Sequence, residues 1–126
     1  MVTTTKALTD LHFEHRLWAN ELNFFADEVK IYEHRLEELV NKYTRNEVLR
    51  ELESYQNQFI RQKEVLDELR HNIKVHEQKI AQSLQRGEEA PLDPDFHEYM
   101  RGEVESFRKI YNDLKTKFYN FLRKYM

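Results

Sequence analysis

The stretch LTDLHFEHRLWANELNFFADEVKIYEHRLEELVNKY, residues 8–43, decides the fold. Large apolar side chains recur along it at alternating spacings of three and four residues, and a histidine occupies one place in the series. This spacing puts all of them on one face of an α-helix. The series is Leu8, Leu11, His15, Trp18, Leu22, Phe25, Val29, Tyr32, Leu36, Leu39 and Tyr43. The pattern predicts one long helix over residues 6–43.

A second helix is predicted over residues 45–86. Thr44 and Glu47 have the spacing of a capping box, in which both side chains bond free N–H groups at a helix start. Gly87 suits the position just after a helix end, where a positive φ is common. The predicted core positions are Val48, Leu52, Tyr55, Phe59, Gln62, Leu66, Leu69, Ile73, His76, Ile80 and Ser83.

Residues 87–94 read as a loop and residues 94–125 as a third helix. Asp93 followed by Pro94 fits an N-cap residue followed by proline in the first helical position. The predicted core positions are Phe96, Met100, Glu103, Phe107, Ile110, Leu114, Lys117 and Phe121, with Val104, Tyr111, Phe118 and Tyr125 beside them.

Three long helices with short connections favour an up-down-up antiparallel three-helix bundle, coiled-coil-like and about 50 Å long. The composition agrees, because 34% of the 126 residues are charged, 40% are hydrophobic, and there are only two glycines and two prolines. A chain of this length is expected to form one domain over residues 1–126. The predicted fold class is all-α.

Charge and composition exclude several classes of partner. The net charge of −3 gives no general attraction to nucleic acid or to an anionic membrane surface. No segment approaches the roughly 18 apolar residues of a membrane span, and no signal-peptide pattern is present. The absence of cysteine excludes disulfides and cysteine-bound metal. We therefore expect a cytoplasmic protein that binds neither nucleic acid nor membrane.

Polar residues interrupt the predicted core at one level. Matching residues across the two predicted hairpins puts His15, His76 and Glu103 within about one helical turn of each other, with His12 adjoining. Two imidazoles and a carboxylate could bind a divalent transition metal such as zinc. The other interpretation is a hydrogen-bonded layer that fixes the register of the helices without any cofactor. The sequence leaves both open.

Catalytic patterns are missing. No serine stands in a nucleophile-elbow context, and no glycine-rich phosphate loop occurs. A slim bundle filled with aromatic side chains also leaves little room for an active-site pocket. We expect a protein without enzymatic activity.

A second apolar series lies on the first predicted helix, away from its core face. It consists of Phe13, Leu17, Phe24 and Ile31, and the bundle alone cannot bury it. Continuous exposed apolar patches tend to mark interfaces. The leading hypothesis is therefore a helical interaction module that self-associates or binds a partner helix through this face. The alternative is a small metal-binding protein that uses the histidine and glutamate layer.

Overall fold

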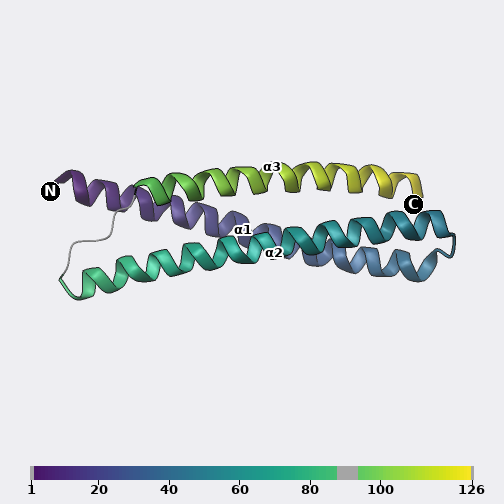
Figure 1. The fold of residues 1–126 in the computed structure, drawn as a ribbon, viewed down its shortest axis with the longest axis horizontal. Helices are drawn as coiled ribbons and strands as arrows, with labels where there is room; N and C mark the ends of the chain where they lie inside the picture. Colours follow the sequence, from purple (N-terminus) through teal and green to yellow (C-terminus); the bar gives the residue numbers. More distant parts are fainter. Residues whose placement is uncertain (1, 88–93, 126) are drawn as a thin grey trace.

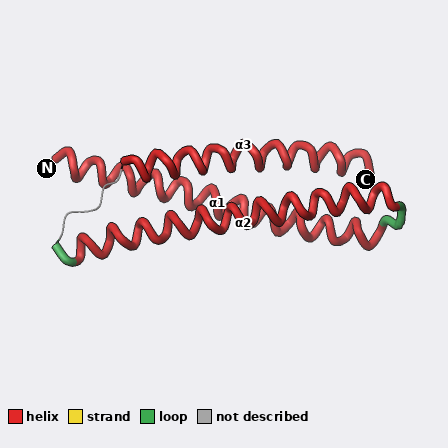
Figure 2. Tube along the Cα trace, viewed as in Figure 1, coloured by secondary structure: helices red, strands yellow, loops and turns green. Residues whose placement is uncertain are grey.

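The computed structural model describes residues 2–87 and 94–125, with side chains from Thr9 onward. These residues form three helices and no strand, as Figure 2 shows. They are α1 (Val2–Lys42), α2 (Asn46–Gln85) and α3 (Pro94–Tyr125). The chain reverses direction after α1 and again after α2, so α1 and α3 run parallel and α2 antiparallel to both (Figure 1). The all-α three-helix fold is confirmed.

The first interhelical turn differs from its prediction at the cap. The N-cap residue of α2 is Arg45, with φ −72° and ψ 130°, and no side chain bonds the free N–H groups there. The predicted capping box at Thr44 is therefore wrong, because Thr44 lies one residue outside the cap. The backbone itself closes the first turn, where Leu49 N–H donates to the Arg45 carbonyl at 3.0 Å.

The other helix ends follow the sequence signals. Gly87 has a φ of 72°, which disfavours residues with a Cβ, and its N–H donates to the Leu84 carbonyl at 3.2 Å. Pro94 is the first residue of α3, where its missing N–H costs nothing. The predicted N-cap, Asp93, lies outside the described residues.

The core positions predicted in α1 and α2 are confirmed wherever the structure describes their side chains, with a few of them half-buried. In α1 the buried series is Leu11, His15, Trp18, Leu22, Phe25, Val29, Tyr32, Leu36 and Leu39. In α2 it is Val48, Leu52, Phe59, Leu66, Leu69, Ile73, His76 and Ile80. The side chain of Leu8 lies outside the described residues.

The predicted core face of α3 is wrong by part of a turn. Ile110 and Lys117 are exposed and Glu103 is only half-buried, although all three were assigned to the core. The buried series alternates strictly between spacings of three and four residues. It is His97, Met100, Val104, Phe107, Tyr111, Leu114, Phe118 and Phe121.

A ladder of ion pairs joins α1 to α3. Each of its three pairs links an acidic residue of α1 to a basic residue 87 positions later, and successive pairs are one heptad apart. The pairs are Glu14–Arg101 at 2.7 Å, Glu21–Arg108 at 2.8 Å and Glu28–Lys115 at 2.9 Å. Partly exposed pairs of this kind contribute only about 0.2–1 kcal/mol each. Their constant offset nevertheless defines one register between two parallel helices.

The start of α3 is set back from the end of α2. The rings of Phe96 and His76 lie 4.7 Å apart between centroids, whereas α2 continues to Gln85. The last turns of α2 therefore extend past the start of α3, as Figure 1 shows. Among the described residues, no helix combines the length and the apolar character needed to cross a membrane.

The burial pattern predicts a sharp contrast between two positions of α2. Leu66 is fully buried, so Leu66→Ala should lower the free energy of unfolding by about 2–5 kcal/mol through lost apolar contact and a cavity. Ile60→Ala is the control, since Ile60 is 50% exposed and should cost less than about 1 kcal/mol. Urea unfolding measures both, and equal costs would contradict the assigned helix face.

Candidate functional site

Three buried histidines, one from each helix, meet near the open end of the first hairpin, where α2 connects to α3. His15 of α1, His76 of α2 and His97 of α3 are 2%, 8% and 7% exposed. The ring of His15 lies 5.3 Å from that of His76 and 5.2 Å from that of His97, between centroids. Imidazoles thus fill this level of the core, whereas apolar side chains fill the other levels. We call these three residues the histidine layer.

Aromatic rings enclose the histidine layer. Trp18 stacks on His97 with 4.9 Å between ring centroids and lies 5.6 Å from His15. Phe96 packs on His76 at 4.7 Å. The imidazoles therefore have apolar neighbours on the inside of the bundle, where a charged ring would be poorly solvated.

Two half-buried carboxylates contact the imidazoles from outside. Glu77 accepts from His15 Nδ1 through one oxygen and lies 2.8 Å from His12 Nδ1 through the other. Glu14 lies 3.0 Å from His97 Nε2 and is also held by Arg101. One carboxylate is therefore shared by two histidines, and the other by a histidine and a guanidinium.

The environment shifts the pKa of two of these groups. Burial lowers the pKa of His15 below its ordinary value of 6.5, although the neighbouring Glu77 acts in the opposite direction. The hydrogen bond from Arg101 lowers the pKa of the Glu14 carboxyl, which His97 reinforces. At neutral pH the imidazole of His15 is therefore neutral and the carboxylate of Glu14 is charged.

The composition of the layer corrects the sequence prediction. His15 and His76 come together as predicted, and His12 adjoins them through Glu77. Glu103 does not join them, because His97 occupies the α3 position in the layer instead. In the described part of the chain, no three or more histidine, cysteine, aspartate or glutamate side chains are grouped to hold a metal ion. The geometry thus gives the zinc hypothesis no support.

The sequence carries a signal for His97 that the predicted α3 series does not use. Starting the α3 series at His97 makes every step to Phe121 three or four residues, with an apolar side chain at each later position. The predicted series instead placed Glu103 and Lys117 in the core. Glu77 had no comparable signal, because it lies beside the core face of α2 rather than on it.

A shallow groove of about 400 Å³ runs beside the histidine layer, between α1 and α2. Ala19, Ile73 and the edge of His15 contribute to its lining, together with cations from both helices. The charged and titratable lining residues are His12, Arg16, Asp67, Arg70, His71, Lys74 and Glu77. Solvent can therefore approach His15 from this side.

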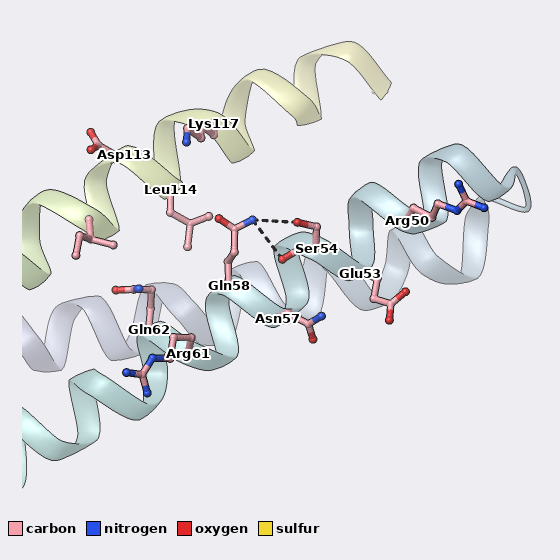
Figure 3. A pocket seen from close by; sticks show the side chains of 11 residues that line it. Arg50, Glu53, Ser54, Asn57, Gln58, Arg61, Gln62, Asp113, Leu114 and Lys117 are labelled. Carbon is pink, nitrogen blue, oxygen red and sulfur yellow. Dashed lines mark hydrogen bonds between the residues drawn. The ribbon is translucent and has the colours of Figure 1, made fainter.

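A wider groove of about 720 Å³ lies between α2 and α3. Its rim is polar, and Figure 3 shows Gln58 turned along α2 toward Ser54 rather than across to α3. The Gln58 amide donates to the Ser54 hydroxyl at 3.2 Å and to its carbonyl at 3.3 Å. Lys117 and Asp113 face the groove from α3. Basic and acidic side chains alternate here without converging on a point, so the groove has no evident chemistry.

The outer face of α1 carries the predicted apolar series. Its members are Phe13, Leu17, Phe24 and Ile31, which are 61%, 51%, 58% and 66% exposed. We call these four residues the α1 stripe. Their exposure agrees with the expectation that the bundle alone does not bury them.

Comparison with protein-family models, with curated proteins and with solved structures finds no match to this chain. Its function is therefore argued from its own geometry.

The histidine layer predicts different roles for two half-buried glutamates. Glu77→Ala removes the acceptor of His15 and His12, and should lower the free energy of unfolding at pH 7.5 by about 1–2 kcal/mol. Glu103→Ala is the matched control and should change it by less than about 0.5 kcal/mol. If thermal or urea unfolding ranks the two variants in the opposite order, the layer is wrongly assigned.

Proposed function

We propose that this protein is a non-catalytic helical module that self-associates through the α1 stripe. The observation that supports this most is the exposure of four large apolar side chains in one line on α1. The opposite face of α1 is already buried in its own bundle. A partner would bury the remaining exposed half of each side chain, a gain of about 1 kcal/mol for each.

The spacing within the stripe favours a second copy of the chain as the partner. Phe13 and Ile31 have their midpoint at residue 22, and Leu17 and Phe24 have theirs between residues 20 and 21. Both midpoints lie within residues 20–22. An antiparallel pairing about a two-fold axis near these residues therefore sets apolar side chains of one copy against those of the other. A stripe whose residue pairs had widely separated midpoints would not match a second copy of itself in this way.

Charges beside the stripe agree with the same pairing. Arg16 and Asp27 lie on one flank of the stripe, at nearly equal distances from the proposed axis. In an antiparallel pair, Arg16 of one copy comes opposite Asp27 of the other, and the contact occurs twice. Within the described residues, neither Arg16 nor Asp27 forms an ion pair, so both are available.

The other flank offers no electrostatic obstacle. Its acidic residues are those of the ion-pair ladder, and each is matched by an arginine or lysine of α3. Two such flanks can approach without the repulsion that an uncompensated row of glutamates would produce. The ladder thus supports both the bundle and the proposed dimer.

We expect the wild-type chain to sediment with twice its 15.5 kDa mass at high micromolar concentration. Leu17→Glu together with Phe24→Glu should give a folded monomer, because charged side chains would be buried in the interface. Ile60→Glu with Leu84→Glu is the matched control on α2, and it should remain dimeric.

A charge exchange distinguishes a second copy from another partner. Arg16→Asp alone and Asp27→Arg alone should each weaken the dimer, whereas the double variant should restore it. A wild-type monomer at high micromolar concentration would overturn the proposal, and so would a double variant weaker than both single ones.

A further inference from the structure

The histidine layer has more imidazoles than its surroundings can compensate in the protonated form. Besides the three buried rings, His12 of α1 shares Glu77 with His15. Glu14 already has the guanidinium of Arg101 as a partner. If all four imidazoles carried a proton, four positive charges would thus face two carboxylates, one of which is already matched.

The positions of these groups make the protonated layer unfavourable. From α1, His12 and Glu14 lie beside the layer; from α2, Glu77 reaches it; and from α3, Arg101 lies one turn after His97. Lys74 and Arg16 line the groove that His15 borders and add further positive charge, whereas Arg70 there is paired with Asp67 at 3.6 Å. With ring centroids only 5.2 and 5.3 Å from His15, two neighbouring imidazolium ions would repel strongly in an apolar surrounding.

The first turn of α3 is the part that this repulsion would displace. It begins at Pro94, carries Phe96 and His97 into the layer, and follows directly on residues that connect it to α2. The main apolar cluster of the bundle reaches the layer at Trp18, Ile73 and Met100 and extends from there toward the first interhelical turn. The layer therefore caps the core at this end, and the rest of the core can stay packed when the cap opens.

We propose that the histidine layer is an acid-operated latch, in which proton uptake by its buried imidazoles releases the start of α3 from the α1–α2 hairpin. The latch is closed at neutral pH, when the ring of His15 is neutral and packs against the other two rings. It opens below about pH 6, where unperturbed imidazoles become charged. Opening exposes Trp18 and Phe96 and leaves the three helices formed. The latch does not depend on self-association.

The direction of the pH dependence follows from the protonation states. His15 has a lower pKa in the closed bundle than its ordinary value of 6.5, so the open state binds protons more readily. The closed state therefore has its full stability above about pH 6.5. It loses stability as the pH falls from there through the lowered pKa of His15. For each extra proton bound by the open state, the ratio of closed to open molecules falls by up to about tenfold per pH unit in this range.

Trp18 makes the latch directly observable, because it is the single tryptophan and packs on two of the three rings. Between pH 7.5 and 5, its emission should shift to the red reversibly while the far-ultraviolet circular dichroism keeps its helical shape. Hydrogen exchange should rise in the peptide that contains Pro94–Met100 and stay low around Leu66 and Phe59. Exchange that rises equally throughout would overturn the latch in favour of whole-chain unfolding.

The variants replace titratable histidine rings with uncharged side chains of similar size. His15→Leu with His76→Leu and His97→Leu should abolish the shift, leaving the emission of Trp18 the same at both pH values. His34→Gln removes an exposed histidine that lies away from the layer and should leave the wild-type transition unchanged. If the triple variant does not fold, His15→Gln alone should move the midpoint to lower pH. An unaltered midpoint in the His15 variant or the triple variant would overturn the proposal.

Discussion

The parallel packing of α1 against α3 at a constant offset of 87 residues is the constraint on which the other features depend. Three ion pairs mark this offset, and the hydroxyls of Tyr32 and Tyr119 add a fourth contact of the same separation at 2.6 Å. Most of the stability comes from the apolar core, because partly exposed ion pairs contribute little. The ladder instead selects one alignment among several that heptad-spaced apolar faces would accept.

Two consequences of this alignment concern function. It brings His97 level with His15, which completes a layer of three imidazoles instead of an apolar level. It also turns the glutamates of α1 toward α3, so the adjoining face of α1 keeps its apolar side chains exposed. The histidine layer and the α1 stripe both follow from the position of α1: two of its sides pack on α2 and α3, where His15 joins the layer, and a third side stays uncovered.

Sequence patterns predicted the fold class, the helix ends to within a few residues and the core faces of α1 and α2, because each depends on spacing within one helix. The core face of α3 was wrong because Ile110 and Phe96 gave a competing series that also had the right spacing. The choice between them depends on which face meets α1, and this is set by contacts between helices. The same error replaced His97 with Glu103, whereas Glu77 was missed because it lies beside the core face of α2.

The register of α1 and α3 can be measured directly, since the chain has no cysteine of its own. Cysteines at positions 21 and 108 should be joined efficiently by a short bismaleimide, as intact mass would show. Cysteines at positions 21 and 115, or at 28 and 108, lie one heptad out of register, about 10.5 Å further apart along the axis, and should react poorly. Preferential joining of either out-of-register pair would contradict the ladder, and with it the placement of His97 in the histidine layer.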